Sequence, residues 1–167
     1  MTHPGSDPDL AAVARAIIEA NAYVTLATAD AAGRPWASPV FYGYEGWATF
    51  LWMSLPDARH SRNLATRPEL GLVVFDSTVA PGAGQAVYMA GAAAEVPADE
   101  VPAALAAYPG PNPRGARPIA ADQLVGPAPW RLYRATVAEH SVLCPRVGGG
   151  MCARHGSPND HRVTVQP

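Results

Sequence analysis

The sequence of 167 residues contains no lysine, and all twelve of its basic residues are arginine. The absence of lysine excludes every mechanism that uses a lysine Schiff base or a lysine general base. A phosphate group would have to be bound by arginine, histidine, hydroxyl groups or backbone amides. The formal net charge of -2 and the pI near 6.2 also leave no broad positive field, so we expect no nucleic-acid and no membrane partner.

Cysteine and long apolar runs are equally scarce. The two cysteines, Cys144 and Cys152, both come late in the chain, which excludes the disulfide framework of a small secreted scaffold. No stretch approaches ~18 consecutive apolar residues, and the N-terminus lacks the basic and apolar regions of a signal peptide. These absences predict a soluble, cytoplasmic protein.

The chain has the composition and length of one packed globular domain, with 49% hydrophobic and 16% charged residues. Apolar residues at helical spacing predict an amphipathic helix over 8–21. Runs of apolar and β-branched residues between turn signals predict strands over 23–28, 36–44, 47–53, 70–76, 85–96 and 130–143. Shorter helices are expected over 57–67 and 99–107, followed by a long connection over 108–129.

This order of elements predicts a mainly β (α+β) fold, a six-stranded antiparallel split β-barrel with flanking helices. Closure of the sheet is favoured because it removes the exposed edges of a meander. We expect residues 1–22 to form a helix that packs on the barrel, residues 23–144 to form the barrel domain, and residues 145–167 to form a loosely ordered tail.

A polar segment, Ser54 to Asn63, follows an apolar strand and enters the short helix over 57–67. Unpaired amides and the positive dipole at a helix start favour a phosphate, and arginine adds bidentate contacts. Arg59, Arg62 and Asn63 stand at i, i+3 and i+4, so we expect them on one helical face beside a single anion. The alternative is a solvated helix face, and composition does not decide between the two.

Three motifs give this sequence a family likeness: Gly33-Arg34-Pro35-Trp36, the strand from Trp47 to Ser54, and Asp57-Ala58-Arg59-His60-Ser61-Arg62-Asn63-Leu64. Together they resemble the pyridoxamine 5'-phosphate oxidase-like split-barrel family, with similarity over 23–95 and again over 130–143. The resemblance implies an FMN-dependent oxidoreductase, a flavoprotein that acts as a homodimer with its cofactor sites at the subunit interface.

The resemblance also implies a cofactor site with three parts. The phosphate-binding part comprises Met53, Ser54, Arg59, His60, Ser61 and Arg62, of which Met53 contributes backbone. The strand along the isoalloxazine ring comprises Ser38, Pro39, Val40 and Phe41, which would act through main-chain groups. The third part comprises Gln85 from a neighbouring strand, and Trp130 and Arg134 from the second subunit.

Substrate and cofactor class are narrowed by departures from the family pattern. Ser38 and Gly43 stand where the vitamin-processing members carry an arginine and a lysine, so we expect a small organic substrate other than pyridoxamine phosphate. A deazaflavin-dependent reductase on the same fold is one alternative, and a non-catalytic module that binds flavin or haem is another. The sequence assigns no catalytic residue, because a flavin would carry the redox chemistry.

The tail contains a second group of metal-ligating residue types: Cys144, Cys152, His155 and His161. Structural zinc sites usually begin with two cysteines about two to four residues apart. Here seven residues separate the cysteines. On that spacing the sequence favours two free thiols in the tail, and we expect no metal site.

Overall fold

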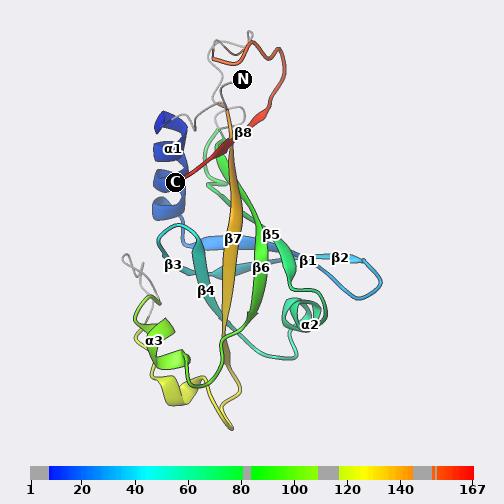
Figure 1. The fold of residues 1–167 in the computed structure, drawn as a ribbon, viewed down its shortest axis with the longest axis vertical. Coiled ribbons are helices and arrows are strands. Elements are labelled where there is room, and N and C mark those ends of the chain that lie inside the picture. The colour runs from blue at the N-terminus through cyan, green and yellow to red at the C-terminus, as the bar shows by residue number, and fades with distance from the viewer. Residues whose placement is uncertain (1–7, 81–83, 109–116, 145–151, 153) are drawn as a thin grey trace.

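The computed structural model describes residues 8–80, 84–108, 117–144, 152 and 154–167 (Figure 1). A curved antiparallel sheet occupies the centre of the molecule. Its strands are β1 (Tyr23–Ala29), β2 (Pro35–Phe41), β3 (Gly43–Glu45), β4 (Thr49–Ser54), β5 (Glu69–Phe75), β6 (Ala86–Glu95), β7 (Arg131–Leu143) and β8 (Arg162–Val165). The helices are α1 (Pro8–Ala20), α2 (Arg59–Thr66), α3 (Val101–Leu105) and the short 3₁₀ helix η1 (Ala121–Gln123).

The sheet order is β2-β1-β5-β6-β7-β4-β3, and β8 pairs with β7 beyond the end of β4. The long strand β7 therefore joins β6 along one edge to β4 and β8 along the other. The two terminal strands of this order, β2 and β3, are separated in the chain by Tyr42 alone. Because the chain passes directly from one end of the sheet to the other, the sheet curls into a half-barrel.

Two apolar cores form on opposite faces of the sheet, because side chains alternate along each strand. Phe50 and Trp52 of β4 belong to the larger core, whereas Leu51 belongs to a smaller one beneath α3 and η1. Helix α1 covers the larger core with Leu10, Ala14, Ile18 and related positions of one stripe. Burial of this stripe, rather than helix propensity, holds α1 in place.

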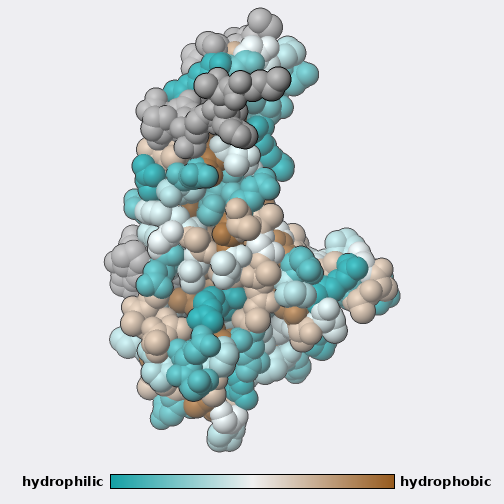
Figure 2. Space-filling view, in the orientation of Figure 1, coloured by the Kyte–Doolittle hydropathy of each residue, from teal (hydrophilic) through white to brown (hydrophobic). Residues whose placement is uncertain are grey.

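The hairpin between β1 and β2 projects from the body of the molecule (Figures 1 and 2). Its turn is fixed by Asp30, whose Oδ1 accepts hydrogen bonds from the amides of Ala32 and Arg34, each at 3.0 Å. Gly33 adopts the left-handed conformation that the turn requires, with φ of 81°. The hairpin holds Trp36 and Ser38 out toward α2.

The predicted fold class is confirmed, with corrections to the strand count. The sheet contains eight strands in the part of the chain that the structure describes, rather than six. The strand expected over 36–44 is divided at Tyr42, whose hydroxyl donates to the carbonyl of Ile18 at 2.6 Å. The tail expected to be loosely ordered contains β8, because Val163 and Val165 pack into the larger core.

Other parts of the expected tail, residues 145–151 and 153, lie outside the described residues, as do residues 1–7 of the N-terminal segment and 109–116 of the long connection. Among the residues that are described, no helix is long and apolar enough to span a membrane.

Candidate functional site

Side chains from β2, β4 and α2 meet in a hydrogen-bonded set that we call the Ser/His group: Ser38, Ser54, His60 and Ser61. Nε2 of His60 lies 2.8 Å from Oγ of Ser54, and Nδ1 of His60 lies 3.1 Å from Oγ of Ser38. Ser61 donates from its Oγ to Oγ of Ser54 at 3.1 Å. One imidazole thus joins two strands that are far apart in the sheet order.

The local sequence explains why these groups converge. Ser54 ends β4 and is buried on the same face as Trp52, so its hydroxyl faces the start of α2. Helix α2 begins at Arg59, after the extended residue Ala58, and its N-terminus has no side-chain cap and no acidic residue in the first turn. The first amides of α2 are therefore not satisfied by a capping side chain, which is the arrangement that binds anions.

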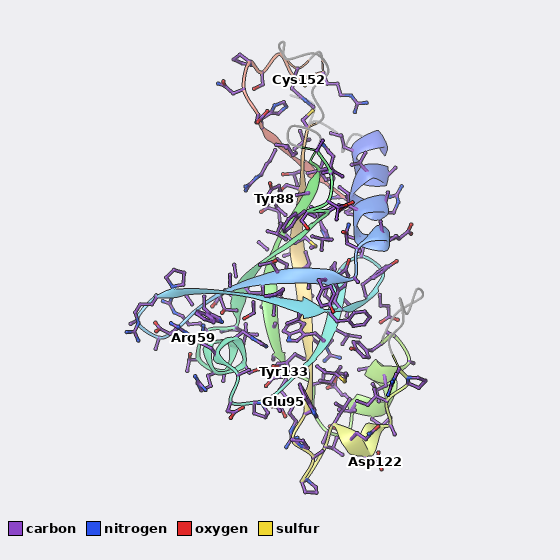
Figure 3. The ribbon with its side chains drawn as sticks, turned by 180° about the vertical axis from the view of Figure 1, so that it is seen from behind. Arg59, Tyr88, Glu95, Asp122, Tyr133 and Cys152 are labelled. Carbon is purple, nitrogen blue, oxygen red and sulfur yellow. The ribbon has the colours of Figure 1, made fainter. Side chains whose placement is uncertain are left out.

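Arg59 is exposed at the start of α2 and lies over the indole of Trp36, 4.3 Å from the ring centroid (Figure 3). Nε1 of Trp36 donates to Oγ of Ser38 at 3.0 Å, which links the indole to the Ser/His group. Sequence reasoning missed this role of Trp36. The signal was its position two residues before Ser38, since i and i+2 share one face of a strand.

The imidazole of the Ser/His group is neutral at pH 7. Burial lowers the pKa of His60 below its ordinary value of 6.5. Either neutral tautomer suits the geometry, because each serine hydroxyl can donate or accept. Positive charge at the site comes from Arg59 and the helix terminus.

The expected alignment of Arg59, Arg62 and Asn63 beside one anion is wrong for Asn63. Asn63 is buried and donates from Nδ2 to Oγ1 of Thr28 at 2.9 Å. The side chain of Asn63 lies on the inner side of α2 and hydrogen-bonds to Thr28 of β1, whereas the side chain of Arg59 is exposed. Arg62 is exposed and donates to the carbonyl of Asp57.

The four β2 residues expected along a flavin ring do not share one face. Val40 is buried in the larger core, whereas Phe41 lies on the other side, edge-on to Tyr23 and Tyr108. Pro39 is exposed. Because β2 ends the sheet order, its outer edge has no neighbouring strand among the described residues.

Met53 precedes Ser54 in β4 and packs on the smaller core, so the two side chains point to opposite faces of the sheet. A backbone role of Met53 at the phosphate stays a prediction.

The remaining expected residues are not joined to the Ser/His group within one chain. Gln85 precedes β6 near Val142, while Ser54 pairs with Arg131 at the opposite end of β7, roughly 35 Å away along the strand. Oε1 of Gln85 is buried and has no hydrogen-bond partner among the residues that the structure describes.

The two late residues, by contrast, lie near the Ser54 end of β7. Trp130 directly precedes Arg131 and is 45% exposed. Arg134 is held by Glu100, with 2.7 Å between Nη2 and Oε2.

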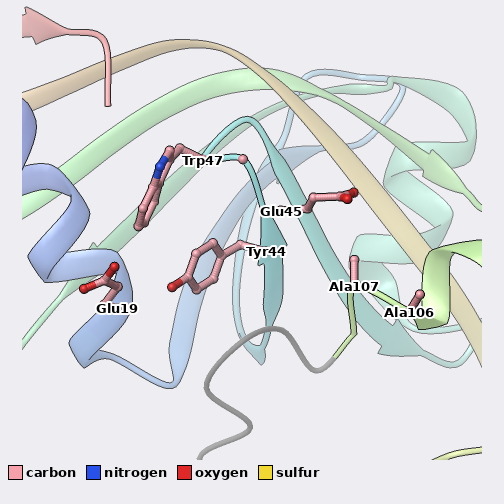
Figure 4. A pocket seen from close by; sticks show the side chains of 7 residues that line it. Glu19, Tyr44, Glu45, Trp47, Ala106 and Ala107 are labelled. Atoms are coloured by element: carbon pink, nitrogen blue, oxygen red, sulfur yellow. The ribbon is translucent and has the colours of Figure 1, made fainter.

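A cavity of about 470 Å³ lies elsewhere, between α1 and the turn from β3 to β4 (Figure 4). The rings of Tyr44 and Trp47 stack there with centroids 5.1 Å apart, and Glu19 and Glu45 add carboxylates. Among the described residues that line this cavity there is no cation, and two carboxylates repel phosphate, so the cavity is a poor candidate for the phosphate of a flavin.

A cavity of about 340 Å³ adjoins the Ser/His group through Ser61. Tyr133 and Glu95 of neighbouring strands also line it, and burial raises the pKa of Tyr133, so its phenol is neutral at pH 7. Sequence reasoning did not single out Tyr133, since a strand tyrosine is usually a core residue.

Several solved structures share this fold. A heme binding protein from Mycobacterium smegmatis is 27% identical, with a TM-score of 0.65 over 98% of this chain. This chain spans 60% of the length of that protein. A FAD-binding protein from Mesorhizobium loti is 20% identical, with a TM-score of 0.59 over 79% of this chain and 92% of its own.

An F420 reductase is 18% identical, with a TM-score of 0.53 over 76% of this chain and 94% of its own. No curated protein sequence matches this chain. A family model described as pyridoxamine 5'-phosphate oxidase, however, matches residues 10–140. The match spans most of α1, the Ser/His group and most of β7, and the chain therefore belongs to the pyridoxamine 5'-phosphate oxidase family of split-barrel proteins.

Proposed function

We propose that this protein binds FMN, with the phosphate at the uncapped start of α2, and acts as an oxidoreductase on a small organic substrate. The observation that carries the proposal is the Ser/His group beside Arg59. Its hydroxyls, the uncapped start of α2 and the exposed guanidinium of Arg59 occur in neighbouring residues, which supports the proposal. These are the groups that a chain without lysine must use for phosphate.

Each residue has a distinct part in this proposal. Arg59 supplies charge-assisted hydrogen bonds, and Trp36 limits its rotamers by stacking. Neutral His60 holds the hydroxyls of Ser38 and Ser54 in place while the α2 amides donate to the phosphate. Arg62 adds to the positive electrostatic potential at the start of α2, where the phosphate would bind.

The isoalloxazine ring would run along the outer edge of β2, beside residues 38–41. When bound, the flavin supplies hydride or electron transfer, and the protein supplies orientation and electrostatics. Ser38 in place of a cation gives no reason to expect a phosphorylated vitamin as substrate.

A homodimer completes the site in this proposal. Tyr23, Trp36 and Trp130 are 62%, 40% and 45% exposed, and aromatic rings of this kind are enriched at protein–protein interfaces. A second copy would cover such rings and would bring Trp130 and Arg134 to the flavin of its partner. A cytoplasmic location, where two cysteines stay reduced, belongs to the same proposal.

The test compares the affinity for FMN and for riboflavin, which lacks the phosphate, in two arginine variants. Arg59→Ala should weaken FMN binding about 10- to 150-fold, the scale of a lost hydrogen bond to a charged group. It should leave riboflavin binding nearly unchanged. Arg67→Ala removes the same charge at the other end of α2, roughly 12 Å away, and is the matched control.

The phosphate assignment is overturned if Arg59→Ala binds FMN as tightly as the native chain while its circular dichroism is unchanged. It is also overturned if FMN and riboflavin lose affinity equally, since that result would place Arg59 against the ring system.

A heme-binding module is the second candidate, favoured by the 27% identity to the heme binding protein from Mycobacterium smegmatis. Similarity to an F420 reductase supports a variant of the first candidate, in which a deazaflavin coenzyme takes the place of FMN. Titration of the purified chain with heme, FMN and the deazaflavin coenzyme separates the three by absorbance.

A further inference from the structure

Beyond the flavin proposal, we propose a structural zinc site in which Cys144, Cys152, His155 and His161 are the four ligands. One ligand atom from each residue lies within 4.8 Å of all the others. The site is independent of the proposed FMN site. It lies where β7 and β8 join, whereas the Ser/His group lies near the other end of β7 (Figure 3).

Four of the six distances between ligand atoms come within about 0.4 Å of the values for tetrahedral zinc, and all six are no longer than 4.8 Å. Zinc–sulfur bonds of about 2.3 Å and zinc–nitrogen bonds of about 2.05 Å place two sulfurs about 3.8 Å apart, sulfur and nitrogen about 3.6 Å apart, and two nitrogens about 3.4 Å apart. The Sγ atoms of Cys144 and Cys152 are 3.4 Å apart. Nδ1 of His155 lies 3.4 Å from Sγ of Cys144 and 3.5 Å from Sγ of Cys152.

The fourth ligand is His161, the residue directly before β8. Nε2 of His161 lies 3.1 Å from Nδ1 of His155. Nδ1 of His161 lies 3.2 Å from the carbonyl of Asn159, so its N–H donates there and leaves the lone pair of Nε2 directed at the site. This is the supporting hydrogen bond that metal-ligating histidines usually make.

The fold explains how residues so far apart in sequence converge. Cys144 follows Leu143, which pairs with Arg162, and the ladder continues as the amide of Cys144 donates to the carbonyl of His161 at 3.0 Å. Cys152 is fixed by hydrogen bonds with Ser157 at 2.8 Å and Gly156 at 2.7 Å. The pairing of β7 with β8 thus brings Cys144 beside His161, although the seven-residue gap between the cysteines is not the usual spacing of a zinc site.

The residue types select zinc and a structural role. Two thiolates and two imidazoles in a tetrahedron suit Zn²⁺, and four protein ligands leave no open position for catalysis. Both cysteines are buried, and His155 is exposed, which leaves an entry path. Binding converts two thiols into thiolates and releases up to two protons, and the ion then fastens β8 to β7.

The test uses the full chain without a histidine tag, expressed in a reducing host and purified with a thiol reductant. Metal analysis should find about one zinc per chain. Replacement by Co²⁺ should give the intense visible bands of a tetrahedral ion and thiolate-to-cobalt charge transfer in the near ultraviolet. A strong chelator should lower the melting temperature.

Cys152→Ser and His161→Gln should each lose stoichiometric zinc, with affinity falling by more than the roughly 10- to 100-fold typical of supporting groups. His60→Ala, which removes a histidine distant from the four proposed ligands, should retain about one zinc per chain. A folded native chain with two titratable thiols and no zinc overturns the proposal. So does a Cys144–Cys152 disulfide, or zinc retained in either ligand variant.

Discussion

Gly91→Ala should disrupt the centre of the sheet, because β6 and β7 approach there more closely than a side chain allows. A Cβ at Gly91 would lie 2.2 Å from the carbonyl oxygen of Thr136 and 2.9 Å from Cα of Val137. Contact requires about 3.2 Å, so one backbone must move by about 1 Å at the register shift between Ala90 and Gly91. Overpacking of this size costs about 1–3 kcal/mol, and two weakened ladder hydrogen bonds add about 1–3 kcal/mol.

The assay is urea and thermal unfolding followed by circular dichroism. For a chain of this length, about 2–6 kcal/mol lowers the melting temperature by roughly 5–20 °C. Gly71→Ala on β5 is the matched control. Its Cβ would meet Cβ of Ala27 at 3.6 Å, an ordinary contact. Equal stability of the two variants would refute the close approach of β6 and β7.

Three further predictions concern buried polar groups. Burial lowers the pKa of His140 below 6.5, so the fold favours the neutral ring, and the free energy of unfolding should fall as the pH drops below 6.5. In urea titrations, His140→Gln should reduce this dependence of the free energy of unfolding on pH. Asn63→Ala leaves the hydroxyl of Thr28 without its donor and should cost about 1–3 kcal/mol in the same titrations. Tyr42→Phe removes the hydrogen bond to the carbonyl of Ile18 and should lower the free energy of unfolding by about 1 kcal/mol. A variant whose helix α1 resists protease as well as it does in the native chain would contradict this prediction.

The architecture could be predicted from sequence because its signals are local. Alternation and turn residues located the strands, and the stripe of Leu10, Ala14 and Ile18 located α1. The division of β2 from β3 at Tyr42 could not be seen, because it results from a contact with α1. The strand β8 was missed because four residues carry too little pattern, and its pairing with β7 depends on tertiary structure.

The candidate site was predictable where its residues are consecutive. Ser54, His60 and Ser61 lie together because strand end and helix start belong to one short segment, and their role at a phosphate stays a prediction. Ser38 joins them only through the curl of the sheet. The orientation of Asn63 was misjudged because helical spacing alone does not say which side of a helix is buried.

The central claim is that this chain holds FMN at the start of α2. The most direct measurement is the absorbance spectrum of the purified protein, together with the mass of the cofactor released on denaturation and the size of the particle in solution. The account predicts flavin absorbance and released FMN, about one per chain, from a dimer. A monomer that takes up heme but neither FMN nor deazaflavin would contradict it.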